Sequence, residues 1–267
     1  MSRRNAADVC RVIFTGCIAA LAGLIASLPA LARTLEVGPK APYHQPSAAI
    51  AAASPGDTIE IAPGTYFDCA VLSASRLTVI GKGAGVVLTD KTCEGKAIFV
   101  ARGNEITIEN ITFARARVPD QNGAGIRVEG RDLTVVNCRF IDNEDGILAG
   151  DATGSRIVIR DSEFLDNGKC ASECAHGIYV GHIALLHIEN SRFSRTKEGH
   201  HVKSRALRTE LVNDTITDGP EGTSSYLVDI SNGGSLVMEN NVLEKGPMSS
   251  NWSAAIVIGA EGVTQPT

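Results

Sequence analysis

The side chains best suited to chemistry gather between His176 and Arg208. Five of the six histidines fall within 26 residues, at His176, His182, His187, His200 and His201. The same stretch contains six lysines and arginines, opposed only by Glu189 and Glu198. A basic band of this kind on an acidic protein is suited to an anionic ligand, and its groups are of the types used for proton transfer and charge stabilisation. The alternative is an ordinary solvated face.

Alternation of apolar and polar residues predicts which of these side chains share a face. Strands that open with Gly-Ile recur at Gly125, Gly146 and Gly177, and Gly199-His200 is placed in the same register. If the isoleucine points inward, the next residue points outward. In successive strands this outward position holds Arg127, Leu148, Tyr179, His201, Asp229 and Val257. Two residues later it holds Glu129, Gly150, Gly181, Lys203, Ser231 and Gly259.

These outward positions predict one candidate site. Neighbouring strands lie about 4.8 Å apart, so Tyr179, His201 and Asp229 are expected to form a row, with Lys203 beside it. The predicted catalytic residues are Lys203, His201 and Arg205. The predicted substrate-binding residues are Tyr179, Arg127, His182, Arg208, Asp229 and Ser231.

Two other chemistries use carboxylates in the same region. Asp145, His176 and Glu198 are assigned one register on consecutive turns, which predicts a Ca²⁺ or transition-metal site. A glycoside hydrolase would instead need a close cluster of outward carboxylates, for which Asp145, Glu198 and Asp229 are the candidates. The paired aspartates typical of polygalacturonases are not evident.

The positioning elements form a repeat. An alternating strand precedes an Asn or Asp, and an apolar residue follows three positions later. The polar members are Asn110, Asn137, Asp161, Asn190, Asn213 and Asn240, spaced 23 to 29 residues apart. Their partners are Phe113, Phe140, Phe164, Phe193, Ile216 and Leu243. This period indicates a solenoid. We interpret the Asn residues as corners that tolerate left-handed backbone, and the Phe residues as core.

Insertions fall at one register of this repeat. They occupy 115–122, 168–175, 218–224 and 246–253. Insertions at a shared register emerge on one face of a solenoid, often the binding face. The two short turns, at 137–146 and 190–199, are therefore expected to lie between walls and to form a groove.

The ends of the repeat differ from its middle. Residues 33–66 predict an N-terminal cap and first strand, with a helix over 47–53, and the turns are clearest over 101–267. No cap is evident after the strand 255–259. An uncovered last strand is an adhesive edge, so self-association is expected there.

Residues 1–32 are typical of a cleaved secretory signal peptide, because three arginines flank an apolar run that ends in Ala30-Leu31-Ala32. The chain is therefore predicted to be periplasmic or secreted, with no stable membrane anchor. Without this segment it has 22 basic and 29 acidic side chains, which argues against nucleic-acid binding. In an exported protein, Cys69 could pair with Cys93 and Cys170 with Cys174, leaving Cys138 as a buried thiol.

The array resembles the right-handed parallel β-helix of the pectate-lyase-like superfamily, and SAAIAAASPGDTIEIAPGTY at 47–66 resembles a segment common near the start of that fold. The resemblance covers essentially all of residues 33–267. It implies an all-β, single-stranded right-handed parallel β-helix with an N-terminal capping helix. Because this fold hosts lyases, hydrolases, epimerases and adhesins, it does not by itself imply one activity.

A narrower resemblance concerns Lys203-Ser204 and Asn213, which are similar to the K-S…N stretch of alginate and chondroitin lyases. There the lysine is the base and an arginine on the next turn assists, which implies Lys203 as base. The matching position here is Ser231-Asn232, so Arg205 or Arg208 would have to replace that arginine. The resemblance also implies Ca²⁺ as a cofactor but does not place its ligands.

Taken with the basic band, these features predict a carbohydrate-active protein that acts on an acidic polysaccharide by β-elimination. That reaction needs a base, and positive charge or a metal beside the carboxylate. The alternative is a non-catalytic polysaccharide-binding or envelope protein, favoured by the missing arginine. A glycoside hydrolase ranks below both.

Overall fold

The structure, a computed structural model, describes residues 31–266, so the predicted signal peptide falls almost wholly outside the described residues. Residues Ala32–Thr267 make one compact unit. Its described part contains 27 strands and a single helix. No helix among these residues is long and apolar enough to cross a membrane.

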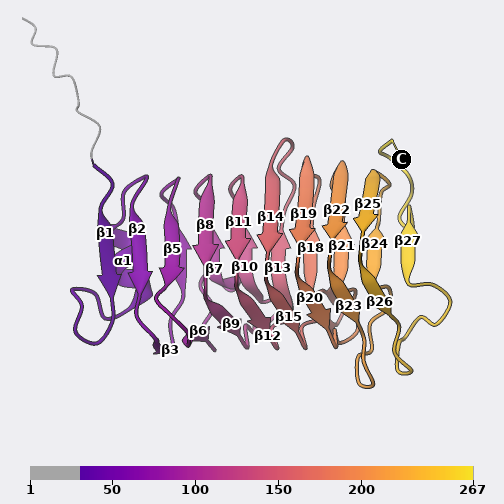
Figure 1. Ribbon diagram of the computed structural model, residues 1–267, viewed down its shortest axis with the longest axis horizontal. Helices are drawn as coiled ribbons and strands as arrows, with labels where there is room; N and C mark the ends of the chain where they lie inside the picture. The colour runs from indigo at the N-terminus through magenta and orange to yellow at the C-terminus, as the bar shows by residue number, and fades with distance from the viewer. Residues whose placement is uncertain (1–30, 267) are drawn as a thin grey trace, which may run out of the picture. The chain divides into compact units, whose positions relative to one another are not determined.

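Three long parallel sheets run side by side along one axis (Figure 1). Sheet A contains β1 (Thr34–Val37), β2 (Thr58–Ile61), β5 (Thr78–Gly81), β8 (Ile106–Glu109), β11 (Leu133–Val136), β14 (Arg156–Arg160), β19 (Leu185–Glu189), β22 (Arg208–Val212) and β25 (Ser235–Glu239). Sheet B contains β3 (Gly64–Tyr66), β6 (Val86–Thr89), β9 (Thr112–Ala114), β12 (Arg139–Ile141), β15 (Glu163–Leu165), β20 (Arg192–Ser194), β23 (Thr215–Thr217) and β26 (Val242–Glu244). Sheet C contains β4 (Ala70–Leu72), β7 (Ala97–Ala101), β10 (Ala124–Val128), β13 (Asp145–Ala149), β18 (Ile178–Val180), β21 (Val202–Ser204), β24 (Val228–Ile230) and β27 (Ile256–Ile258). From β2 onward each turn of the coil gives one strand to each sheet, which confirms the predicted all-β parallel solenoid.

Phenylalanines of successive turns fill the space between the sheets. Phe140 stacks on Phe164 with ring centroids 4.6 Å apart, and Phe164 stacks on Phe193 at 4.4 Å. All three rings are fully buried. Aromatic rings in offset stacks stabilise each other beyond their buried area, so the predicted core assignment of the Phe series is confirmed.

The repeated Asn and Asp residues form the corner between sheet A and sheet B. All six have positive φ, between 51° and 57°. Asn tolerates this left-handed conformation because its short polar side chain bonds locally. The amides also stack: Asn137 Nδ2 donates to Asn110 Oδ1 at 3.1 Å, and Asn213 Nδ2 donates to Asn190 Oδ1 at 3.3 Å. The predicted corner role is confirmed.

The N-terminal helix lies where the sequence predicts it. Helix α1 (Pro46–Ala52) begins with a proline in its first turn and buries Ala49 and Ile50. It packs beside β1 and β2 at the start of the coil (Figure 1). The cysteines also pair as anticipated, since disulfides join Cys69 to Cys93 and Cys170 to Cys174, and the Cys138 thiol is buried.

The last turn leaves β25, β26 and β27 as the outer strands of the three sheets within residues 31–266. Val242, Met248 and Trp252 are exposed nearby. The chain continues past β27 and returns toward sheet C, where Gln265 bridges to Gly233. Self-association at this end stays a prediction.

In the last four turns a second column of polar side chains, Ser162, Ser191, Asp214 and Asn241, lies two positions before the core residue of sheet B. There Ser191 N–H donates to Asp214 Oδ1 at 2.7 Å, and Asp214 N–H donates to Asn241 Oδ1 at 2.7 Å. Asp214 Oδ2 is buried and has no hydrogen-bond partner. Burial raises the pKa of Asp214 to about 6. An unpartnered buried carboxylate is costly to ionise, so this residue destabilises the coil at neutral pH.

Asp214→Asn is therefore expected to raise the free energy of unfolding. Asp214 ionises near 3.8 when unfolded and near 6 when folded, so the native state binds more protons between these pH values and stability falls as pH rises. The gain should be absent at pH 3 and reach at most roughly 3 kcal/mol above pH 7. Urea unfolding at several pH values measures it. Asp161→Asn, at an exposed corner, is the control, and a pH-independent gain at Asp214 would contradict the argument.

Candidate functional site

The predicted register of sheet C is correct in every strand but one. Arg127, Leu148 and Tyr179 are paired in adjacent strands, as expected. In β21, however, Val202 pairs with Ile178 and Lys203 pairs with Tyr179. The prediction that placed His201 beside Tyr179 is wrong by two residues. Val202 fills the inward position above Ile178, while Gly199, at φ 34°, belongs to the preceding turn.

This correction strengthens the cluster around Lys203. Lys203 pairs with Asp229 of β24, so Tyr179, Lys203 and Asp229 form one row across β18, β21 and β24. Two residues later, Arg205 N–H bonds to Val180 O and Ser231 N–H bonds to Ser204 O. Arg205 and Ser231 therefore lie beside that row. The structure thus brings together five residues that the sequence predicts for the site.

Two hollows lie over this face. The cationic hollow, of about 360 Å³, is lined by His176, His200, Lys203 and Arg205, with Glu173 and Glu261 at its rim. The acidic hollow, of about 460 Å³, is lined by Asp120, Asp145, Asp151 and Glu173, with Arg127 opposite them. Both hollows include Glu173, Cys174 and Tyr179. They are therefore two parts of one groove.

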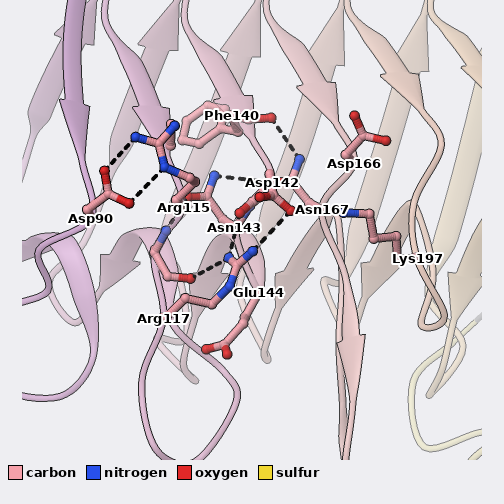
Figure 2. A network of polar contacts seen from close by, with 12 residues as sticks. Asp90, Arg115, Arg117, Phe140, Asp142, Asn143, Glu144, Asp166, Asn167 and Lys197 are labelled. Carbon is pink, nitrogen blue, oxygen red and sulfur yellow. Dashed lines mark hydrogen bonds and ion pairs between the residues drawn. The ribbon is translucent and has the colours of Figure 1, made fainter. Parts of the chain in front are cut away.

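Insertions build the walls of the acidic hollow, as predicted. Glu144 Oε2 accepts hydrogen bonds from the backbone N–H groups of Val118 and Gly123, at 3.0 and 2.7 Å, and so fixes the loop 115–123. Figure 2 shows Glu144 beside Asn143, which with Asn167 joins the backbone of neighbouring turns. The opposite wall is the hairpin of β16 (Lys169–Cys170) and β17 (Cys174–Ala175). Its disulfide closes the tip that carries Ser172 and Glu173.

Lys203 and Arg205 form a cation pair on the floor of the cationic hollow. Lys203 Nζ lies 2.6 Å from Glu261 Oε1 and 3.8 Å from Asp229 Oδ2. Arg205 donates through Nε to the Tyr179 hydroxyl at 2.8 Å and also pairs with Glu261. Burial acts to lower the pKa of Arg205, but its bonds to Tyr179 and Glu261 outweigh burial and raise it. Both cations therefore converge on one carboxylate.

Asp229 lies beneath this pair and is almost fully buried. Its Oδ2 accepts a hydrogen bond from Ser231 Oγ at 2.9 Å, and His200 Nε2 lies 3.4 Å away. Its Oδ1 is buried without a partner. Burial raises the pKa of Asp229. The predicted Asp229 and Ser231 thus support Lys203 from below.

A row of side chains links four turns beside the cation pair. His176 N–H donates to Asp145 Oδ1, His200 N–H donates to His176 Nδ1, and Tyr226 N–H donates to His200 Nδ1, at 2.6 to 3.1 Å. Because each Nδ1 is an acceptor, both rings carry their hydrogen on Nε2. Burial lowers the pKa of both histidines, that of His200 to about 4. They are neutral donors at physiological pH.

This row contradicts the predicted metal set. Asp145 and His176 do share a register, but the third member is His200 and not Glu198. The cause is the two-residue error in the predicted register of β21. The Glu198 carboxylate instead accepts a hydrogen bond from Cys170 N–H. A metal-ligating histidine needs a free ring lone pair, and each Nδ1 lone pair of His176 and His200 is already bonded. Within residues 31–266 no group of three or more His, Cys, Asp and Glu side chains is arranged to hold a metal ion.

His201, predicted to be catalytic, is fully buried away from the groove. Its Nε2 donates to Asp218 Oδ1 at 2.9 Å, and its Nδ1 accepts from the Thr196 hydroxyl at 2.7 Å. Burial lowers the pKa of His201, whereas bonds from His201 and Ser224 overcome burial and lower that of Asp218. A neutral imidazole thus donates to a buried carboxylate, which is a structural role.

The other three predicted binding residues lie apart from the cation pair, and of these Arg127 lines the acidic hollow. Arg208 is in β22 of sheet A, where its Nε pairs with Glu210 at 2.6 Å. It is therefore not on the groove face, and its prediction is wrong. His182 follows Gly181 beside the acidic hollow and pairs through Nδ1 with Asp151 at 2.9 Å.

Several contributors to the groove escaped the sequence prediction. Glu261 and Asn232 both bond Arg205, and Glu173 lies between the two hollows. The repeat gave no signal for Glu261, since its segment follows the last strand. The wall predicted at 218–224 instead folds around buried Asp218 and Ser224.

The comparisons agree with this architecture. YbhC of Escherichia coli has a similar structure, with a TM-score of 0.50 and 13% identity over 83% of this chain and 86% of that one. A pectin methylesterase from carrot gives 0.48 and 14% over 87% and 88%, and PemA, the Erwinia chrysanthemi pectin methylesterase, gives 0.45 and 10% over 86% and 93%. At these identities the likeness concerns the fold alone. No curated protein matches the sequence. The family described as the right handed beta helix region matches residues 67–216. The chain belongs to this right-handed β-helix family.

Proposed function

We propose that the chain binds an acidic polysaccharide in the groove over sheet C, with a uronate carboxylate held by Lys203 and Arg205. The observation that carries the proposal is the convergence of both side chains on one carboxylate, that of Glu261. Arginine and carboxylate make charge-assisted hydrogen bonds of defined geometry. The same two cations can receive a ligand carboxylate.

The length and lining of the groove fit a polymer better than a small anion. From Arg127 in β10 to Asp229 in β24 the row crosses five strands, or about 19 Å. Tyr179 lies between the hollows, with Lys203 Nζ 5.7 Å and Arg205 Cζ 5.6 Å from its ring centroid. Its aromatic ring offers a surface for a sugar, and the neutral histidine donors suit hydroxyl groups.

We place the protein outside the cytoplasm. The predicted signal peptide supports this location, and so do the disulfides Cys69–Cys93 and Cys170–Cys174, because such bonds persist in oxidising compartments. Cell fractionation of the tagged full chain tests it. Recovery of the uncleaved chain in the cytoplasm would contradict the location.

A second candidate function is β-elimination in the same groove. Lys203 and Arg205 can neutralise the carboxylate and stabilise the dianion that forms. Lysine is a cation at neutral pH, and Lys203 is paired with two carboxylates, so we assign it to charge stabilisation in place of the predicted base role. A phenol is protonated at neutral pH as well, so the Tyr179 hydroxyl, bonded to Arg205 Nε at 2.8 Å, is the candidate proton donor to the leaving glycosidic oxygen, and water takes the proton from the carbon. Ca²⁺ has no assigned part in this proposal.

Titration with polygalacturonate, alginate and glycosaminoglycans tests both candidates. Lys203→Ala is expected to weaken binding about tenfold, or about 1.4 kcal/mol, because one of two carboxylate partners is lost. Lys40→Ala, an exposed lysine elsewhere, is the control. Ultraviolet absorbance of unsaturated products that depends on Tyr179 would establish elimination. Retention without turnover would establish a binding protein, whereas equal binding by the Lys203 and Lys40 variants would refute the groove assignment.

A further inference from the structure

The carboxylate on the cation pair belongs to a segment that borders the cationic hollow. We call residues 259–265 the strap. It follows β27 and returns over β24, where Glu261 N–H bonds to Ser231 O and Gln265 Nε2 donates to Arg205 O. Thr264 and Gln265 N–H groups both bond to Asn232 O. The strap therefore ends directly above the predicted ligand contacts.

Hydrogen bonds and ion pairs, and not apolar packing, hold the strap in place. Glu261, Gly262, Val263 and Thr264 are all exposed, so apolar burial contributes little. Gly259 and Gly262 have φ of 75° and 95°, a conformation that glycine adopts readily. Segments with few buried contacts and exposed hydrogen bonds open at low free-energy cost. The side-chain anchors are the ion pairs of Glu261 with Lys203 and Arg205, together with the hydrogen bonds from Gln265 Nε2 to Arg205 O and from Asn232 Nδ2 to Gly262 O.

A buried acceptor lies below the strap without a donor. Asp229 is 2% exposed, and its Oδ1 has no hydrogen-bond partner. Asp229 contacts Lys203, the same side chain that Glu261 binds. An unsatisfied buried oxygen is uncommon and costly. Asp229 does not line the cationic hollow, so its part is to keep Lys203 in place, through Oδ2, when Glu261 leaves.

We propose that the strap is an internal stand-in for the ligand. The Glu261 carboxylate occupies the position of a uronate carboxylate on Lys203 and Arg205, and an acidic oligosaccharide binds by displacing the strap. The closed strap thus lowers the affinity of the groove for weak or monovalent anions. This inference rests on the proposed function.

The test compares Glu261→Gln with the wild-type full chain, using oligogalacturonate and oligoalginate as probes. Glutamine keeps the size of the side chain and removes its charge. The variant is expected to bind the probe about five- to tenfold more tightly. Hydrogen exchange at the Thr264 and Gln265 amides is expected to rise about tenfold in the variant, and in the wild type on adding the probe. Glu244→Gln, an exposed glutamate of sheet B, is the matched control.

The outcomes separate this inference from the proposed function. Equal affinities of wild type and Glu261→Gln, with measurable binding, would overturn the inference and leave the function standing. Weaker binding by Glu261→Gln would overturn it too, because Glu261 would then contact the ligand. Slower exchange at Thr264 and Gln265 on adding the probe would mean that the strap closes over the ligand, again against the inference. Absence of binding by both proteins would overturn the function and the inference together.

Discussion

Replacing His201 by alanine is expected to lower the free energy of unfolding by about 3–5 kcal/mol. His201 and Asp218 are both fully buried, 2.9 Å apart between Nε2 and Oδ1. Without His201 the buried Asp218 carboxylate keeps only the hydrogen bonds from Ser224 Oγ and Gly246 N–H. The lost bond to a charged group and the cavity left by the imidazole together cost about that amount. The Thr196 hydroxyl also loses its acceptor. Chemical denaturation monitored by circular dichroism measures the loss.

Matched variants separate this structural role from the catalytic role that the sequence suggested. His187→Ala, on the outer face of sheet A beside Glu210, is expected to cost about 1 kcal/mol, because this pair is partly exposed to solvent and ion pairs at the surface contribute little. Asp218→Asn combined with His201→Ala should cost less than the two single losses together, because no charge stays buried alone. If the His201→Ala protein had normal stability but no longer bound or cleaved the polysaccharide, His201 would belong to the functional site and its structural role would be refuted.

Arg205→Ala is expected to weaken binding of an acidic oligosaccharide about 100-fold, or about 2.7 kcal/mol. The guanidinium contacts Tyr179, Asn232 and Glu261 at once, so its loss removes a carboxylate contact and also frees the Tyr179 hydroxyl. Truncating one member of a partly buried charge pair has effects of this size. Calorimetric titration at fixed ionic strength gives the value.

Arg205→Lys tests the geometry of this contact. Lysine keeps the charge but lacks the planar fork that reaches two partners, so it should recover less than half of the lost binding energy. Arg192→Ala, an exposed arginine of sheet B, controls for net charge. Full recovery by lysine would show that only charge matters at this position, contrary to the structure.

The scaffold could be predicted because its signals repeat. Every turn needs a residue that tolerates positive φ at the sheet A–sheet B corner, so Asn recurs there, and every turn needs a large apolar side chain three residues later. Those demands are local and independent of the ligand. The same signal therefore recurs in six consecutive turns and predicts one fold. The N-terminal helix, observed over 46–52, is predicted separately from its own composition.

The site was harder to predict than the scaffold, because the register of β21 depended only on the alignment of Gly199-His200 with the Gly-Ile openings. Gly199-His200 resembles the Gly-Ile pair that opens the other strands. A shift of two residues keeps the same side chains pointing inward or outward, so the alternation of the sequence cannot detect it. Only the pairing of Val202 with Ile178 settles it. Asp218, the partner of His201, lies 17 residues from it, and Glu261, the partner of Lys203, lies 58 residues from it. Neither carboxylate stands at a position of the repeat that predicts its contact.

The shared Tyr179 gives the groove a direction. On one side of its ring lie Asp120 and Asp151, and on the other lie Lys203 and Arg205. A sugar chain also has two unlike ends, so its two orientations in the groove are not energetically equivalent. If the groove binds a polysaccharide as proposed, a uronate on the cation pair would place the next unit near Tyr179 and the one after it near carboxylates, where a neutral or amino sugar would be tolerated better than a second anion. Such a groove would distinguish the order of sugars along a polymer as well as its total charge.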